Sequence, residues 1–371
     1  MRLVRKYRKI FYFIFFTLQF ASVSWGLGSG DRLYRLIFGI SMPFLLLAAF
    51  GGEYTKAEWG RICFIIFLAA WAYLQNGSRS LILSFMAVAG AKNMDVKKIL
   101  KASFWILLVC MTVKISLCIL GILQNEAFFL PKENGIWHTI YSYGYASPNN
   151  LYFHLMMAVL LGAAVYGERA GAFVVAVVTA AMYIWYEVLM CRTGWFCYLF
   201  FLILYILCRI ARQKGWIRLR QFLDIGMVGS YGMLAALNWG MVFAYAKGMG
   251  WMKRINTLMN NRFGWALTAF ESTGFSFLGG RGAGQLDMLY SSMLVNYGIL
   301  TTGLFIGAHI KAMWVLHKER EYLVLACMTA VALYSFMEVN AVNLMWNPFL
   351  LYLTIPLFEG DKNAQNTEIL L

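Results

Sequence analysis

The sequence is short of charged residues, above all of acidic ones. Only 13% of its 371 residues are charged, and it has 17 acidic residues against 32 basic ones. Soluble domains average about 25% charged residues, whereas this chain is 61% hydrophobic. Such a chain cannot bury its apolar surface in one soluble core. We therefore expect an all-α polytopic membrane protein whose surface is largely covered by lipid.

The sequence also lacks the patterns that mark disulfides, metals and familiar catalytic sets. Its seven cysteines lie in or beside apolar runs and form no CxxC pair, so neither a disulfide framework nor a zinc site is indicated. There are only four histidines, and no Ser/His/Asp order or membrane-protease motif stands out. We predict that the protein uses no cofactor and no metal. The 13 Trp and 21 Tyr residues suit rings anchored at membrane interfaces.

Long apolar runs indicate about twelve transmembrane helices. Ten runs approach or exceed the roughly 20 residues that span a bilayer, at about 10–28, 33–51, 102–123, 150–167, 170–190, 194–210, 222–245, 289–315, 321–340 and 342–358. Two shorter runs, about 61–76 and 80–91, are either thin spans or a re-entrant hairpin. No convincing cleavage site follows the first run, so we expect it to be retained as a helix. We find no internal repeat and treat residues 1–371 as a single transmembrane domain.

The basic residues test this count. If the chain starts in the cytoplasm, every dense basic cluster falls on the cytoplasmic side, as the positive-inside rule requires. These clusters lie at residues 2–9, 92–101, 209–220 and 317–320. Both termini are then cytoplasmic. The net charge of +15 follows mainly from topology, so we predict no nucleic-acid partner.

The same topology leaves two long extracytoplasmic loops, about 124–149 and 246–288. The second loop has five basic residues, Lys247, Lys253, Arg254, Arg262 and Arg281, against Glu271 and Asp287. Basic charge outside runs against the topological bias and needs another reason. It either contacts anionic lipid headgroups or forms a site for an anionic substrate.

Arg192 is the most informative polar residue at a membrane boundary, where such residues are costly. It lies at the expected outer turn between 170–190 and 194–210, in Cys191-Arg192-Thr193-Gly194. A guanidinium grips two phosphate oxygens at once. Gly194 lets the backbone come close, and the following helix offers free N–H groups to an anion. Alternatively, Arg192 reaches the outer headgroups or pairs with Glu187.

The second outer loop holds a further constellation. Asn261 and Arg262 open an amphipathic run, and a glycine cluster at 279–284 precedes Asp287. The glycines suit a turn whose amides cradle phosphate, but no Walker motif is present. Asp287 either caps the next helix, pairs with an arginine, or acts as a general base.

The first outer loop and the last spans supply the remaining candidates. Asn149, in Ser147-Pro148-Asn149, enters a helix, and His138 precedes it; His138 is either plain surface or catalytic. We expect His154 and His309 to satisfy hydrogen bonds between helices. Glu338 most plausibly neutralises an outer arginine. Lys114, in mid-span, has Glu187 and Glu338 as candidate partners if the fold brings them together.

In order, these residues resemble the Wzy-type polysaccharide polymerases, relatives of the O-antigen polymerases and ligases. The resemblance covers roughly residues 140–350. It is carried by Gly144-Tyr145-Ala146-Ser147-Pro148-Asn149, Arg192-Thr193-Gly194, Asn261-Arg262, Leu278-Gly279, Leu286-Asp287-Met288-Leu289-Tyr290, Glu338 and Asn347-Pro348-Phe349. It implies a GT-C-like bundle of helices in a bacterial plasma membrane.

The resemblance also implies an activity. Such enzymes take polyprenyl-pyrophosphate-linked oligosaccharides at the outer leaflet and transfer the growing chain onto a new unit. Arg192 and Arg262 would contact the pyrophosphate, with Arg281 a looser candidate. A flippase and a chain-length regulator would be protein partners, beside membrane lipid. The rival readings are a ligase of the same fold, which uses another acceptor, and a flippase or other transporter of lipid-linked oligosaccharide.

Overall fold

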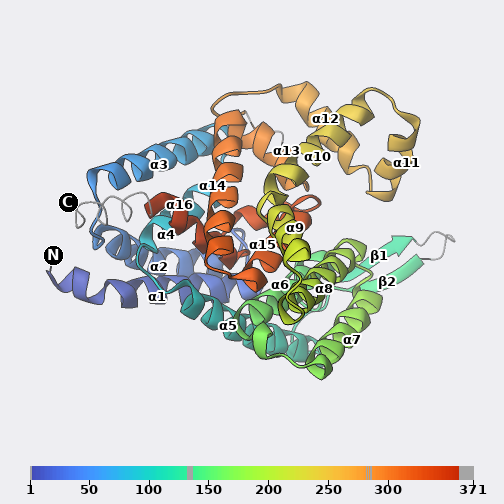
Figure 1. Cartoon of the computed structure of the whole chain (residues 1–371), viewed down its shortest axis with the longest axis horizontal. Helices are drawn as coiled ribbons and strands as arrows, with labels where there is room; N and C mark the ends of the chain where they lie inside the picture. Colours follow the sequence, from blue (N-terminus) through green and yellow to red (C-terminus); the bar gives the residue numbers. More distant parts are fainter. Residues whose placement is uncertain (1, 132–136, 281, 283, 285, 359–371) are drawn as a thin grey trace. The chain divides into compact units, whose positions relative to one another are not determined.

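The computed structural model describes residues 2–131, 137–280, 282, 284 and 286–358 (Figure 1). The chain is mainly helical, with one two-stranded sheet in the described part. It divides into two compact units. Unit 1 comprises Met1–Ala48 and Met94–Ile210, and unit 2 comprises Ala49–Asn93 and Ala211–Leu371. We describe each unit by itself.

Unit 1 is built from six helices and a hairpin. Its elements are α1 (Arg2–Ser24), α2 (Arg32–Phe50, whose last two residues belong to unit 2), α5 (Val96–Ile119), β1 (Ala127–Pro131), β2 (Trp137–Tyr141), α6 (Pro148–Tyr166), the 3-10 turn η1 (Gly167–Arg169), α7 (Ala172–Leu189) and α8 (Arg192–Gln213, which runs on into unit 2). The central helix is α6, which packs against α5 and α7 and is the most buried helix of the unit.

Local sequence explains how α6 begins. The Ser147 side chain accepts a hydrogen bond from the Asn150 amide, and Pro148 occupies the first helical turn. Serine caps and early prolines both favour a helix start, because the first amides of a helix have no partner within it. The predicted helix start at Ser147-Pro148-Asn149 is therefore confirmed.

Unit 2 contains the remaining elements. These are α3 (Lys56–Asn76), α4 (Ser80–Gly90), α9 (Ile217–Val228), α10 (Ser230–Ala246), α11 (Gly250–Leu258), α12 (Arg262–Thr273), α13 (Leu289–Ser292), the π-helical turn η2 (Met293–Tyr297), α14 (Gly298–Lys318), α15 (Tyr322–Ser335), the 3-10 turns η3 (Asn340–Val342) and η4 (Pro348–Leu353), and α16 (Thr354–Phe358).

Helix α15 forms the centre of unit 2. It packs against α9, α10 and α14, and of its residues only Leu333 is not buried. A helix that is apolar on every side belongs in the interior of a protein or membrane. The polar turn that follows α15 carries Glu338, so this buried helix fixes the place of that carboxylate.

The long apolar helices show that the protein is embedded in a membrane. Seven helices are long and apolar enough to span one: Arg32–Phe50, Lys56–Asn76, Val96–Ile119, Pro148–Arg169, Ala172–Leu189, Arg192–Gln213 and Leu289–Lys318. There are eight if α9 and α10, bent by 59° relative to each other, form one span. Helices such as α7 expose large apolar side chains, among them Phe173, Val177 and Ile184, which suit contact with lipid.

The predicted count of about twelve spans is not confirmed. The described chain has seven or eight helices that meet the length and composition of a span, while α4, α15 and η4–α16 are shorter apolar helices. Helix α1 does not qualify, because its first residues are strongly basic. The expected side of each loop stays a prediction.

The two expected long loops contain regular structure. In the first, β1 and β2 form an antiparallel hairpin, with Ala127 opposite Tyr141 and Leu130 opposite His138. The second contains α11 and α12. Both stretches therefore contain secondary structure, and α12 brings Arg262 into a defined position.

Candidate functional site

The site in unit 2 begins at the tight turn between α11 and α12. Asn260 and Asn261 both have positive φ angles, 52° and 61°, a conformation that asparagine tolerates better than most residues. Asn256 fixes this turn: its side chain donates to Asn261 and accepts from the Gly264 amide. The asparagine pair therefore turns the chain sharply, so that α12 starts at Arg262.

Helix α12 is held down by its apolar face. Phe263 is fully buried and meets the Phe336 ring edge-on at 6.2 Å. Ala269 packs with Leu286 and Val295 in a small apolar cluster. These contacts hold α12 in place at both ends of its apolar face. They therefore fix the backbone position from which the Arg262 side chain extends.

The guanidinium of Arg262 joins three segments of unit 2. Its Nε atom lies 3.2 Å from Oδ2 of Asp287, and Nη2 donates to Oε1 of Glu338 at 2.8 Å. Nη1 donates to the carbonyl of Met337. The Arg262 side chain is only 8% exposed. A planar guanidinium offers five N–H groups in a fixed fork, so its shape matches this set of three acceptors.

Two carboxylates face one guanidinium here, and their surroundings differ. The Glu338 side chain is 12% exposed, whereas that of Asp287 is 42% exposed. Burial raises the pKa of Glu338 above its ordinary value; Arg262 opposes this shift, and the nearby Asp287 adds to it. Asp287 is therefore the carboxylate that solvent can reach, and Glu338 is the one enclosed by protein.

The glycine cluster before Asp287 packs against the turn η2. A Cβ atom on Gly280 would lie 2.0 Å from the carbonyl oxygen of Val295. The Gly279 amide donates to the Ser276 hydroxyl, and the Ile299 and Leu300 amides bond to the carbonyls of Ser276 and Phe277. The glycines therefore allow two backbone segments to touch. This close packing explains why glycine is needed at position 280; the expected phosphate cradle stays a prediction.

Asn347 belongs to the same end of unit 2. Its side-chain amide donates to the Ala341 carbonyl at 3.0 Å, and its backbone N–H donates to the Asn343 carbonyl. Asn347 is almost completely buried. It therefore stabilises the η3–η4 connection that follows Glu338.

Arg192 lies in unit 1, at the first turn of α8, and is exposed. The turn before it is sharp: Met190 ends α7 with a φ angle of +51°. An exposed guanidinium at the start of a helix, where amide groups have no helical partner, suits an anion. The structure thus gives Arg192 the accessibility that Arg262 lacks.

Gly194 is in contact with the ring of Tyr152 in α6. A Cβ atom at position 194 would lie only 2.1 Å from that ring. The Tyr152 hydroxyl donates to the Met182 carbonyl of α7 at 3.2 Å, so this ring links α6, α7 and α8. Gly194 is therefore needed for helix packing, and its expected role beside an anion stays a prediction.

The other predicted residues of unit 1 are spread over α6 and the hairpin. Asn149 is exposed in the first turn of α6, and His138 is half-buried in β2. His154 contacts the Val23 and Asn150 carbonyls and thereby ties α6 to α1, as expected of a helix-linking histidine. His309 contacts the Phe305 carbonyl within its own helix.

Lys114 has partners that the sequence did not suggest. Its ammonium donates to the Trp25 carbonyl and lies 4.5 Å from the centre of the Tyr145 ring. The Tyr145 hydroxyl donates to the Ser24 carbonyl. This cation is therefore accommodated by a carbonyl and an aromatic face, whereas Glu187 and Glu338 had been the candidate partners.

The structure brings Asn261, Arg262, Asp287 and Glu338 together in unit 2. The pairing of Glu338 and Asp287 with an arginine is confirmed at the level of contact. Arg192, Gly194, Asn149 and His138 belong to unit 1, and Arg281 lies outside the described residues. Asn256 and the Met337 carbonyl could not be singled out from the sequence, because neither residue type carries a pattern of its own.

Comparison of the chain with protein families, with curated proteins and with solved structures gave no match.

Proposed function

We propose that the protein is a metal-independent glycosyltransferase that polymerises polyprenyl-pyrophosphate-linked oligosaccharides into a surface polysaccharide. The observation that supports this most is the Arg262 centre, defined as Arg262, Asp287 and Glu338 with the Met337 carbonyl. Three segments that are distant in sequence supply it. These are also three of the segments in which the sequence resembles polysaccharide polymerases.

In the proposed reaction, a hydroxyl of the incoming unit attacks the anomeric carbon of the growing chain. The bond between that carbon and the pyrophosphate oxygen breaks, and polyprenyl pyrophosphate leaves. The hydroxyl proton passes to Asp287, whose side chain is the more exposed of the two carboxylates. A general base at this position lowers the barrier by removing the proton as the new bond forms.

We assign Arg262 and Glu338 a positioning role. Arg262 already donates to two carboxylates and one carbonyl, so the centre has no excess positive charge to attract a pyrophosphate. Its guanidinium holds the Asp287 carboxylate in one orientation, and Glu338 holds the guanidinium. This assignment differs from the direct pyrophosphate contact that the family resemblance implies for Arg262.

The family resemblance makes Arg192, in unit 1, the candidate for contact with the pyrophosphate of the lipid carrier. It is exposed at the first turn of α8, and a guanidinium stabilises charge that develops on phosphate oxygens. We further propose that the reaction takes place at the outer face of a bacterial plasma membrane, with both termini in the cytoplasm.

A vesicle experiment separates this proposal from its rivals. Purified protein is reconstituted with lipid-linked repeat units that carry a fluorescent sugar tag. A polymerase yields longer lipid-linked chains. A ligase yields product only when another acceptor is supplied, and a flippase moves units across the bilayer without chain growth. Translocation without growth would refute the enzyme assignment.

A further inference from the structure

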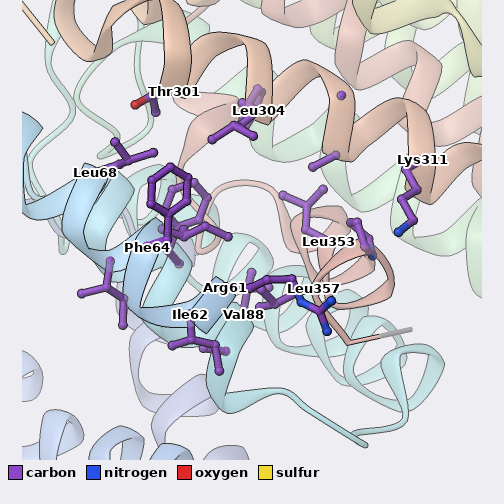
Figure 2. A pocket seen from close by; sticks show the side chains of 18 of the residues that line it. Arg61, Ile62, Phe64, Leu68, Val88, Thr301, Leu304, Lys311, Leu353 and Leu357 are labelled. Carbon is purple, nitrogen blue, oxygen red and sulfur yellow. The ribbon is translucent and has the colours of Figure 1, made fainter. Parts of the chain in front are cut away.

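Unit 2 has an apolar cavity of about 340 Å³ that is separate from the Arg262 centre. It is bounded by α3, α4, α14, and the η4–α16 segment, with Phe64, Leu68, Val88, Leu304 and Leu357 among its walls. Figure 2 shows these side chains around the open space. Its volume falls in the range of small-molecule and lipid sites, about 300–1,000 Å³.

Two cations line this otherwise apolar cavity, and no acidic residue does. They are Arg61 on α3 and Lys311 on α14. In Figure 2 their nitrogen atoms lie on one side of the cavity, and Thr301 and Leu68 lie on the other. Both cations therefore lie at one end of the cavity, and the other end is apolar apart from the Thr301 hydroxyl. Charge at one end and apolar walls along the rest match the polarity of an anionic amphiphile.

Two side-chain nitrogen atoms of Arg61 lack a partner in the part of the chain that the structure describes. Its Nε and Nη2 atoms are shielded from solvent and have no hydrogen-bond acceptor. The nearby cation Lys92 offers a contrast, because it donates to the carboxylate of Glu58. Shielded charged groups without acceptors are costly, so an anion at Arg61 would stabilise this end of the cavity.

The dimensions of the cavity fit one leaflet of a bilayer. Along α14, the lining runs from Thr301 to Lys311, a distance of about 15 Å at 1.5 Å per residue. Half of the hydrocarbon core of a membrane is also about 15 Å thick. Lys311 lies towards the end of α14 that carries His317 and Lys318, which the charge distribution assigns to the cytoplasmic side.

We propose that this cavity binds an anionic membrane phospholipid, with its phosphate on Arg61 and Lys311 and an acyl chain along Phe64 and Leu304. The two cations supply charge complementarity to the headgroup, and the aliphatic walls supply a surface for the chain. This inference does not depend on the proposed polymerase activity, because it rests on a different part of unit 2.

Native mass spectrometry of the purified full-length protein tests the proposal. The protein is released from mixed micelles with equal amounts of phosphatidylglycerol and phosphatidylcholine, two lipids with the same acyl chains. We expect phosphatidylglycerol to be retained. Since one cation near an anionic lipid surface strengthens binding by about fivefold, the double variant Arg61→Gln/Lys311→Gln should lower the preference by about tenfold or more.

Two further variants make the test specific. Lys318→Gln removes an exposed cation from the same helix and should leave the preference unchanged. Leu304→Trp fills the cavity without altering charge and should reduce retention of lipid; it also serves if the double variant does not fold. Equal retention of both lipids by the unaltered protein would overturn the proposal. So would an equal loss in Lys318→Gln, full retention in Leu304→Trp, or a second copy of the chain in place of the lipid.

Discussion

The Nε atom of Arg262 lies 3.2 Å from Oδ2 of Asp287. Glu338 accepts a hydrogen bond from Nη2 of the same guanidinium at 2.8 Å. A single planar group therefore sets the relative positions of two carboxylates. The shape of the guanidinium matters here as much as its charge, and the first prediction follows from that difference.

Arg262→Lys should lower both stability and activity. The ammonium of lysine is a point charge and cannot donate to Asp287, Glu338 and Met337 in the same geometry. Leaving shielded polar groups without partners costs about 1–3 kcal/mol, and we expect a loss of that size in the free energy of unfolding in mixed micelles. The matched control is Arg254→Lys, at an exposed position of α11. Equal behaviour of the two variants would remove the Arg262 centre from the account.

Asp287→Asn should abolish most of the polymerisation while the protein remains folded. The carboxylate is 42% exposed, so its replacement by an isosteric amide disturbs packing little. Loss of a general base lowers rates by about 10²–10⁴-fold. Polymer length on gels and single-turnover rates measure the effect. Glu271→Gln, which neutralises an exposed acid on α12, is the control, and wild-type rates in Asp287→Asn would exclude Asp287 as the base.

Glu338 should give the protein a distinctive pH dependence. Burial raises its pKa, so the folded protein holds this proton more tightly than the unfolded chain does. The stability of the wild type relative to Glu338→Gln should therefore fall as pH rises from the unfolded pKa of about 4.3 to the folded pKa, and stay constant above it. Unfolding free energies of both proteins between about pH 4 and pH 8 show this difference. A difference that grows with pH would mean that Arg262 dominates and the pKa is lowered.

Gly194→Ala should destabilise unit 1, because the added methyl group would lie 2.1 Å from the Tyr152 ring. Overpacking of this kind costs about 1–3 kcal/mol. Gly171→Ala is the matched control, since no atom lies within 4 Å of a Cβ placed there. Thermal unfolding in detergent compares the two. If the second change Tyr152→Leu does not restore stability to Gly194→Ala, the contact is not the cause.

The sequence identified the charged residues of the Arg262 centre, but not which of them pair with each other. Polar residues in a lipid-rich chain are few, so Arg262, Asp287 and Glu338 stood out. Glu338 was expected to neutralise an arginine, and it does. Which arginine it meets could not be predicted, because the two residues are 76 positions apart. They come together because α12 and α15 both pack against α10.

Other features depend on packing that hydropathy does not report. Gly194 was singled out because it gives access to the backbone. Its contact with the Tyr152 ring could not be predicted, because that ring comes from another helix. The number of spans was predicted from apolar runs. Some of these runs form short or bent helices, such as α15 and the α9–α10 pair, because buried apolar sequence looks the same whether it crosses a membrane or fills a core.

The most direct test of the account is the coupling between chain growth and release of the lipid carrier. Purified protein and lipid-linked repeat units should yield one polyprenyl pyrophosphate for each unit added, with no nucleotide sugar present. Arg192→Lys and Asp287→Asn should each slow growth and release to the same extent, because the two belong to one transfer step. Chain growth without released pyrophosphate, or release that both variants leave unchanged, would contradict the account.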